Sequence, residues 1–365
     1  MRVGFVFPKK QKCGISIYSA RYVEALKKIP VEVMEIDMTD LYSDNVNGNR
    51  LVENLDVLHV QYEASFFLRN RKDLFRQLFY ALEKPLIVSL HEVYEKNPFV
   101  FPRENIRPPF QFVKRKIYDW RHPLQTMYRR HVRSQFFADR VLVHHEYHKG
   151  ILEAGGVESS RIKVIGHPVK AVATGETDGV KAGKPVRLGC AGFINPQYDF
   201  DLLFRSLEKL SADWKFTWVG GTRNRSQEKL LSDLNSRIRL MNWEHRFSFS
   251  GWMDENRFNA SLGNLDLALC LFSSRSSSGS MTDLLGSGVP IIATDLEMTR
   301  EIARDCRSVA LVERDSGEVS RAVDDFCKDS VDRSRIQGDI RQYCELNSYE
   351  KKALEMLQVY REVLS

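Results

Sequence analysis

The stretch SSRSSSGSMTDLLGSGVP, residues 273–290, holds residue types that suit the binding of an anion. It follows the apolar run LDLALCLF and leads into an amphipathic segment, so we expect a strand, a loop and a helix that begins near Ser280. Backbone N–H groups and hydroxyls that converge at a helix start can bind a diphosphate, and Arg275 adds a positive charge. Serines also cap helices without any ligand, which is the alternative. The loop predicted to bind the anion comprises Ser276, Ser277, Ser278, Gly279 and Ser280.

Polar residues also stand where two expected strands end in the first half of the chain. The segment LHVQYEASFF places His59, Gln61 and Glu63 at one strand end, and IVSLHEVYE places His91 and Glu92 at another. The carboxyl ends of parallel strands meet at one edge of a sheet, where ligands bind. A histidine at a strand end is commonly a hydrogen-bonded structural residue as well, and that alternative stays open.

Two further groups look like metal sites but favour other roles. VLVHHEYHKG brings together His144, His145 and His148 without the HExxH spacing, and a strand-to-helix turn would splay these side chains. Asp199 and Asp201 form a DxD sequence that leads into the amphipathic LLFRSLEKL, where capping of the helix start is the preferred interpretation. We therefore expect neither a metal nor another cofactor.

Short apolar runs alternate with amphipathic stretches along the chain, which is typical of parallel sheets built from βα units. A last helix is expected from about Tyr349 to Leu364, with Asn347 and Glu350 as a capping box at its start. The fold class is thus α/β, with two doubly wound Rossmann-like domains. Strands are expected at 3–7, 31–36, 57–61, 86–91 and 141–144, and again at 186–191, 215–219, 247–250, 265–271, 290–294 and 309–312.

A shift in composition divides the chain. Residues 170–185 are rich in Gly, Ala, Thr and charged residues and lack apolar periodicity, which is typical of a linker. We predict an amino-terminal domain at 1–170, a linker at 171–185, a carboxy-terminal domain at 186–345 and a final helix at 346–365. A chain of 365 residues with 43% hydrophobic residues is large enough to form two cores.

The amino terminus and the cysteines indicate a cellular compartment. MRVGFVFPKK has an apolar run of only five residues, which is shorter than the core of a signal peptide or a membrane span. Six cysteines are scattered without a CxxC pair, as expected for buried reduced thiols. We therefore expect a cytoplasmic protein. The chain contains no GK[ST] phosphate loop and no GxGxxG sequence, which counts against an ATPase or a dehydrogenase.

Residues 101–135 form a basic stretch interleaved with aromatic residues. They hold nine Lys and Arg against Glu104 and Asp119, a net charge of +7. Such a segment suits the inner surface of an anionic membrane, at about 1 kcal/mol per cation near the headgroups. A solvated helix is the alternative, and nucleic acid is not expected because no recognised binding motif accompanies the stretch. The residues predicted to make this contact are Lys114, Arg115, Lys116, Trp120, Arg129 and Arg130.

Taken together, these segments give the chain a resemblance to the GT-B glycosyltransferases of family 4. The resemblance implies a retaining enzyme of the EC 2.4 type, which moves a hexose or related sugar from a nucleotide diphosphate sugar to a glycan or lipid-linked acceptor, in the synthesis of surface polysaccharide or glycolipid. It also implies that the amino-terminal domain receives the acceptor, that the carboxy-terminal domain binds the donor, and that the last helix crosses back. The segments that carry it are FVFPKKQKCGISIYSARYVEAL, LHVQYE, LIVSLHEVY, RVLVHHEYHKGIL, IKVIGHPV, CAGFINPQYDFDLLFRSL, WKFTWVGG, FSFSGWMDEN and DLLGSGVPIIATDLEMTREIA.

The resemblance also assigns roles to single residues. Gly14 and Gly192 would face the donor phosphates, His91 would reach the donor sugar, and Gln61 and Glu63 would lie on the acceptor side. Retaining transfer of this kind is ascribed to front-face attack, in which the leaving phosphate helps to deprotonate the acceptor. No protein nucleophile is then required, and catalysis rests on orientation and on electrostatic stabilisation of the departing diphosphate.

The chain departs from the family pattern at several positions. An E-x7-E pair is expected after the strand LDLALCLF, and its positions are held by Arg275 and Asp283. Asp283 keeps a carboxylate for the ribose hydroxyls, whereas Arg275 reverses a charge and cannot accept a hydrogen bond. Phe193 and Tyr198 stand where an Arg and a Lys often hold the diphosphate. Arg275 is therefore predicted to act as a substitute cation in catalysis; the alternatives are a non-catalytic scaffold or binding subunit and a peripheral membrane protein.

Overall fold

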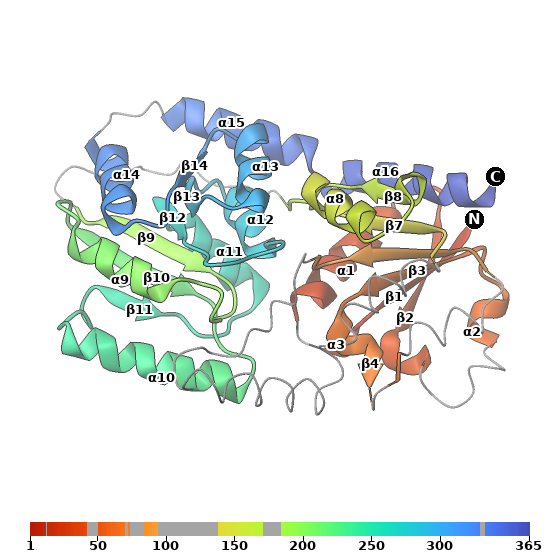
Figure 1. Ribbon diagram of the computed structural model, residues 1–365, viewed down its shortest axis with the longest axis horizontal. Coiled ribbons are helices and arrows are strands. Elements are labelled where there is room, and N and C mark those ends of the chain that lie inside the picture. Colours follow the sequence, from red (N-terminus) through yellow and green to blue (C-terminus); the bar gives the residue numbers. More distant parts are fainter. Residues whose placement is uncertain are drawn as a thin grey trace. The chain divides into compact units, whose positions relative to one another are not determined.

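The computed structural model describes residues 1–11, 13–41, 50–69, 72–73, 84–93, 138–170, 184–328 and 333–365. The described chain divides into two compact units (Figure 1): unit 1 comprises residues 1–166 with 349–365, and unit 2 comprises residues 167–348. The basic stretch, with Lys114, Arg115, Lys116, Trp120, Arg129 and Arg130, lies outside the described residues, as do residues 171–183 of the predicted linker.

Unit 1 is built on a six-stranded parallel sheet with the order β2-β1-β3-β6-β7-β8. Its strands are β1 (Arg2–Phe7), β2 (Glu32–Asp37), β3 (Val57–Tyr62), β6 (Leu86–Leu90), β7 (Arg140–Val143) and β8 (Ile162–Val164). A short antiparallel pair joins β4 (Leu68–Arg69) to β5 (Lys72–Asp73). The helices are α1 (Gly14–Leu26), η1 (Met38–Leu41), α2 (Arg50–Glu53), α3 (Ala64–Phe67), α8 (Glu146–Ala154), η5 (Ser159–Arg161) and α16 (Tyr349–Leu364).

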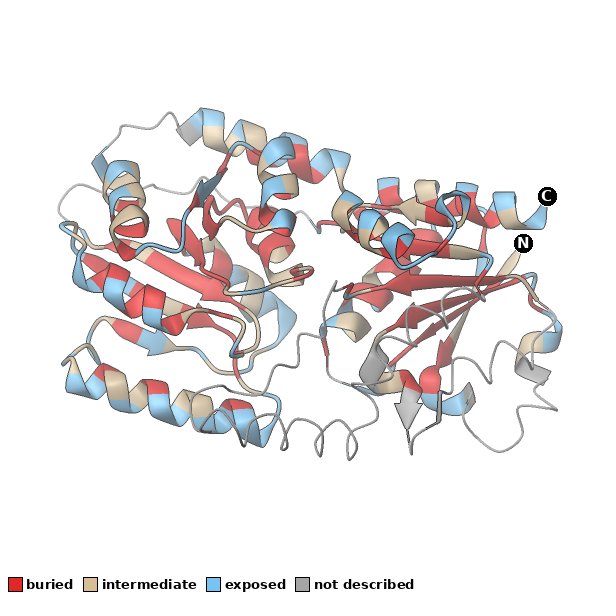
Figure 2. Ribbon diagram, viewed as in Figure 1, coloured by how far each residue is buried: buried red, intermediate tan, exposed pale blue. Residues whose placement is uncertain are grey.

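Both faces of this sheet are covered, which explains why its inner strands β1, β3 and β6 are buried along almost their whole length rather than at alternate positions (Figure 2). On β3, Leu58 and Val60 pack into one core, while Val57 belongs to the core on the other face. The second core also contains Tyr22 of α1 and Tyr360 of α16. Side chains with a period of two along each strand therefore serve two separate cores.

The last helix, α16, belongs to unit 1 although it is the final segment of the chain. The Tyr22 hydroxyl donates to the Lys352 carbonyl oxygen at 3.0 Å, and Met356 and Tyr360 are buried against α1 and the sheet. Lys28 and Glu350 form an ion pair of 2.8 Å at the exposed rim. The prediction that the final helix crosses back to the amino-terminal domain is confirmed.

Unit 2 has a second six-stranded parallel sheet, with the order β11-β10-β9-β12-β13-β14. Its strands are β9 (Val186–Ala191), β10 (Trp214–Val219), β11 (Phe247–Phe249), β12 (Leu267–Cys270), β13 (Ile291–Thr294) and β14 (Val309–Val312). Its helices are α9 (Phe200–Glu208), α10 (Arg225–Leu240), α11 (Glu255–Gly263), α12 (Gly279–Gly286), α13 (Glu297–Asp305), α14 (Ser316–Lys328) and α15 (Arg333–Leu346).

The α/β class with two doubly wound Rossmann-like domains is therefore confirmed. Each strand expected from the sequence is present within two residues of its predicted ends. Three strands were not predicted: β4 and β5 have two residues each and β8 has three, and such short runs do not stand out in the sequence. None of the helices in the described residues is long and apolar enough to cross a bilayer.

If α16 is an integral part of the core of unit 1, shortening its buried side chains destabilises that unit. Met356 is 2% exposed, so we expect Met356→Ala to lower the free energy of unfolding by about 2–5 kcal/mol. Leu354 lies on the same helix but is 51% exposed, and Leu354→Ala should change it by no more than about 0.5 kcal/mol. Urea denaturation of both variants measures this, and equal losses would contradict the packing of α16.

Candidate functional site

The strand order of unit 2 reverses direction between β9 and β12. From β9 the chain proceeds to β10 and β11 on one side, and from β12 to β13 and β14 on the other. In a parallel sheet of this topology the loops at the carboxyl ends of the two central strands separate and leave a crevice for a ligand. The loops concerned are 192–199, after β9, and 271–278, after β12.

The backbone approaches closely at the start of the loop after β9. Gly192 has φ +103°, and a Cβ on it would lie 3.3 Å from Cβ of Ser280 in the first turn of α12. The carbonyl oxygen of Gly192 accepts a hydrogen bond from Nε1 of Trp218 at 2.9 Å. Gly220, with φ +137°, lies so close that a Cβ on it would be 2.2 Å from the same oxygen. Only glycine fits at these two positions, and their packing brings the β9 and β10 loops against the start of α12.

The serine stretch forms the end of the β12 loop and the first turn of α12. The predicted helix start near Ser280 is confirmed, since α12 begins at Gly279. Ser278 caps the helix, because its hydroxyl accepts from the Met281 N–H at 3.4 Å and lies 3.0 Å from the Ser280 hydroxyl. Ser276 is buried and Ser277 is half-buried. The Met281 N–H is thus bonded to Ser278, whereas the N–H groups of Gly279 and Ser280, at the very start of the helix, have no acceptor within the helix.

Asp283 lies three residues after Ser280 and therefore on the same side of α12. It is half-buried. Since Ser280 contacts the Gly192 loop, we expect Asp283 to lie on the side of the helix that faces this loop. Its predicted contact with ribose hydroxyls stays a prediction.

Arg275 is tied into the β12 loop by neutral oxygen atoms. Its Nε donates to the Ser277 carbonyl oxygen at 2.9 Å, and its Nη1 donates to Oε1 of Gln197 at 2.7 Å. The guanidinium also lies 5.7 Å from the ring centre of Phe272. Within the described residues no carboxylate pairs with it. These bonds join the β9 and β12 loops, so in this structure Arg275 holds the two loops together.

A group of two aromatic rings and an arginine beside these loops was not predicted from the sequence. The rings of Phe193 and Trp252 stack with centroids 5.7 Å apart and planes inclined by 19°, and Trp252 is 53% exposed. The Arg223 guanidinium lies 5.1 Å from the centre of the Phe193 ring. Arg223 is itself exposed, at the carboxyl end of β10. The sequence signal was the polar, glycine-rich WVGGTRNR after a strand, together with the tryptophan that follows Gly251.

The other positions of this region have structural roles. Tyr198 is buried and its hydroxyl donates to the Leu269 carbonyl oxygen at 2.8 Å, so it belongs to the core and burial raises its pKa. Asp199 caps α9 by accepting from the Leu202 N–H at 2.9 Å, and it pairs with Arg314. Asp201 pairs with Arg237. The prediction that Asp199 caps this helix is confirmed.

In unit 1, the residues predicted at strand ends form one hydrogen-bonded chain. His91 Nε2 lies 3.0 Å from Oε1 of Gln61, and Nε2 of Gln61 lies 3.1 Å from Nε2 of His59. His59 continues through Nδ1 to the Tyr360 hydroxyl at 2.7 Å, and the Ser89 hydroxyl is 2.8 Å from its Nε2. His59 and Gln61 are fully buried, whereas His91 is half-buried.

The remaining predicted residues of unit 1 lie at the same edge. Gly14 begins α1 after β1 and is exposed, and Glu63 follows β3 and is half-buried. The His91 ring packs edge-on against Tyr18 of α1, with centroids 4.8 Å apart. His144 lies 5.6 Å from the His91 ring and donates through Nδ1 to the Ile165 carbonyl oxygen. Three ring systems thus surround the end of β6.

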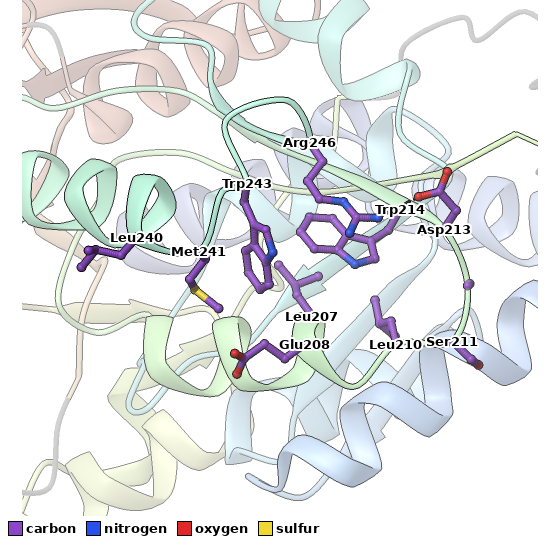
Figure 3. A pocket seen from close by; sticks show the side chains of 11 residues that line it. Leu207, Glu208, Leu210, Ser211, Asp213, Trp214, Leu240, Met241, Trp243 and Arg246 are labelled. Atoms are coloured by element: carbon purple, nitrogen blue, oxygen red, sulfur yellow. Dashed lines mark hydrogen bonds and ion pairs between the residues drawn. The ribbon is translucent and has the colours of Figure 1, made fainter.

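A cavity of about 610 Å³ lies elsewhere in unit 2, at the amino end of β10 (Figure 3). Arg246 lies over the Trp214 ring, 4.2 Å from its centre, and pairs with Asp213 at 2.7 Å. This cavity opens at the edge opposite the strand ends where the crevice lies. Its lining residues are Leu207, Glu208, Leu210, Ser211, Ala212, Asp213, Trp214, Leu240, Met241, Trp243 and Arg246.

Comparison with known proteins relates these features to a family. Residues 185–329, within unit 2, match the family described as glycosyl transferases group 1. The match covers the sheet of unit 2 with most of its helices and does not extend to unit 1. No curated protein is similar enough in sequence to count as a match.

Solved structures with the GT-B fold are similar over nearly the whole chain, at sequence identities that establish the fold alone. Anabaena HepE in complex with UDP and glucose has a TM-score of 0.70 and 12% identity, over 99% of this chain and 100% of that one. Sucrose-phosphate synthase from Thermosynechococcus elongatus has a TM-score of 0.75 and 13% identity, over 99% and 98%. The lipopolysaccharide outer core galactosyltransferase WaaB has a TM-score of 0.63 and 13% identity, over 98% and 99%.

The burial of His59 predicts a pH dependence of stability. Burial, with a further contribution from His91, lowers the pKa of His59 to about 3, while an unfolded histidine titrates near ~6.5. Between these values the unfolded chain binds a proton that the folded chain does not. Stability is therefore highest above pH ~6.5 and falls by about 1.4 kcal/mol per pH unit on acidification. Urea titrations between about pH 5 and 7 measure this slope of stability against pH, and His59→Gln should remove it. His245→Gln, at an exposed residue, should retain it.

Proposed function

We propose that this protein transfers a hexose or related sugar from a nucleoside diphosphate sugar to a glycan or lipid-linked acceptor. The proposal starts from the match of residues 185–329 to the group 1 glycosyl transferases and from the GT-B fold. The observation that carries it is the meeting of Gly192, the start of α12 and Arg223 at the switch point of the unit 2 sheet. Backbone N–H groups and a cation are the groups that bind a diphosphate.

In this proposal the diphosphate lies between Gly192 and the first turn of α12. The Ser280 hydroxyl and the N–H groups of Gly279 and Ser280 donate to phosphate oxygens, and the helix dipole adds a favourable potential. Asp283, on the same face of the helix, accepts hydrogen bonds from the ribose hydroxyls. Trp252 is 53% exposed and stacked on Phe193, and the nucleoside base stacks on its ring.

Arg223 supplies the positive charge that neither Phe193 nor Tyr198 provides. Its guanidinium is exposed next to the Phe193 ring, and no carboxylate in the described part of the chain pairs with it. Arg275, by contrast, already donates to Gln197 and Ser277. A cation that is free of competing acceptors loses less when it turns to a phosphate, so we assign the electrostatic role to Arg223 and the bracing role to Arg275.

We further propose that transfer proceeds with retention, through front-face attack assisted by the leaving phosphate. His91 acts on the donor sugar, and Glu63 is on the acceptor side. The donors named with similar structures include UDP-glucose for Anabaena HepE, and WaaB acts on lipopolysaccharide outer core. They support a uridine diphosphate sugar as donor and a surface polysaccharide or glycolipid as product.

Calorimetric titration with UDP and with uridine tests the donor site. We expect UDP to bind more tightly than uridine, and Arg223→Ala to weaken UDP about 10- to 100-fold, because a hydrogen bond to a charged group contributes about 1.5–3 kcal/mol. Uridine binding should not change. Arg225 is an exposed arginine two residues away, and Arg225→Ala serves as the matched control, with less than about a twofold effect.

Absence of binding by UDP and by the other nucleoside diphosphates at millimolar concentration would refute the enzymatic function. A scaffold or binding subunit would then be the better interpretation. A loss of UDP affinity in Arg275→Ala but not in Arg223→Ala would reverse the roles of the two arginines.

We also propose that the basic stretch 101–135 attaches the protein to the inner surface of an anionic membrane, where a lipid-linked acceptor is presented. Neutralising Lys114, Arg115 and Lys116 should weaken co-sedimentation with phosphatidylserine vesicles by about 100-fold, since each cation contributes about 1 kcal/mol. Neutralising three exposed cations of α10, Arg225, Lys229 and Arg239, is the control with the same change in charge. Equal losses in both triple variants would show that total charge, rather than this stretch, binds the vesicles.

A further inference from the structure

We infer that Gln61 is a positioning residue, which holds the His91 ring in one tautomer and one orientation through its buried side-chain amide. His59, Ser89 and Tyr360 hold Gln61 in turn. The inference rests on the proposed function, in which His91 acts on the donor sugar. It also replaces the expected direct contact between Gln61 and an acceptor, because Gln61 is fully buried and both ends of its amide are engaged.

Burial makes these hydrogen bonds obligatory. Gln61, His59 and Tyr360 are fully buried, and Ser89 is 2% exposed. A polar group that is removed from water without a partner costs free energy, so each member of the chain has to satisfy its neighbour. Their positions come from three separate elements, β3, β6 and α16, which are packed around a common core. Such a chain cannot rearrange at one link without leaving another link unsatisfied.

The chemistry of the amide gives the chain a direction. An amide nitrogen only donates, so Nε2 of His59 accepts from Gln61, and the Ser89 hydroxyl donates to the same nitrogen. The His59 ring is neutral, because burial lowers its pKa to about 3, and its single proton is therefore on Nδ1. That Nδ1–H donates to the Tyr360 hydroxyl oxygen at 2.7 Å. The other end of the amide, its oxygen, faces His91.

The consequence for His91 follows from the same rule. The amide oxygen of Gln61 only accepts, so Nε2 of His91 carries a proton and donates it at 3.0 Å. In the neutral ring Nδ1 is then the accepting nitrogen. Tyr18 packs edge-on against the ring at 4.8 Å and His144 lies at 5.6 Å, which limits rotation about the remaining bonds. Gln61 thus selects which nitrogen of His91 acts on a sugar hydroxyl.

Gln61→Met tests this inference, because methionine has a similar volume and length but neither donates nor accepts well. We expect kcat to fall about 10- to 100-fold while KM for the donor and the calorimetric affinity for UDP stay within twofold, since only orientation is lost. Nitrogen-15 NMR of histidine-labelled protein should show His91 as the Nε2–H tautomer in the wild type and as a mixture in Gln61→Met. A merely structural role would not produce the change of tautomer.

Val60→Ala is the matched control. Val60 is the preceding residue on β3 and is equally buried, but it faces the opposite core. Its truncation should lower stability without altering kcat or the His91 tautomer. Unchanged kcat and an unchanged tautomer in Gln61→Met would overturn the inference, and so would an equal fall in kcat in Val60→Ala.

Tyr360→Phe provides a second variant for the case that Gln61→Met does not fold. It removes only the hydroxyl that accepts from His59, at the far end of the chain, 301 residues from His59 in sequence. We expect a mixture of His91 tautomers and a fall in kcat of about threefold to tenfold, smaller than for Gln61→Met because two links intervene. A single unchanged tautomer would contradict the chain.

The NMR experiment needs no donor, so it separates this inference from the proposed function. His91→Ala should abolish transfer and leave UDP affinity unchanged. If His91→Ala retains full turnover, the role of His91 in the proposed function is wrong, while the tautomers of Gln61→Met still decide whether Gln61 positions the ring.

Discussion

Parallel pairing of the strands in both six-stranded sheets is the constraint on which the rest of the structure depends. Strands that all run in one direction must be joined by crossovers, and these helices bury both faces of each sheet. The same geometry brings every loop after a strand to one edge. Gly192 and Ser280 are far apart in the sequence, yet a Cβ on the glycine would lie 3.3 Å from the serine Cβ. Binding groups gather at this edge because the topology leaves no other place for them.

In the proposed function, the loops at the switch point of unit 2 bind a diphosphate with few formal charges of their own. Tyr198 is in the core, where its hydroxyl bonds Leu269, and Phe193 contributes only a ring to the wall. Burying a cation costs free energy unless hydrogen-bond acceptors surround it. The half-buried Arg275 accordingly donates to two neutral oxygen atoms, whereas Arg223 stays exposed to water. The dipoles of α12 carry no such desolvation cost, since their N–H groups are part of the helix.

The sequence was sufficient for the elements and for the loops that matter, because apolar periodicity and strand-end position are local signals. It placed α12 within one residue of its observed start and identified Asp199 as a cap. It was not sufficient for side-chain direction. The sequence does not reveal that Arg275 turns toward Gln197, or that Asn347 donates its amide to Tyr343 at the end of α15. These choices depend on acceptors brought near by tertiary structure, as does the stacking of Trp252 on Phe193.

The same limit applies most strongly to Gln61, whose position at a strand end suggested contact with a ligand. It is instead fully buried, and its partner His59 is bonded to Tyr360 of α16, from the other end of the chain. A neutral imidazole has one donor and one acceptor, so the donating nitrogen and the accepting oxygen of the Gln61 amide set the direction of the bonds to His59 and to His91. Without residues 349–365, Nδ1 of His59 would lose its partner, the Tyr360 hydroxyl. The return of the last helix to unit 1 therefore completes the fold and also supplies the last hydrogen bond of the buried chain that ends at His91.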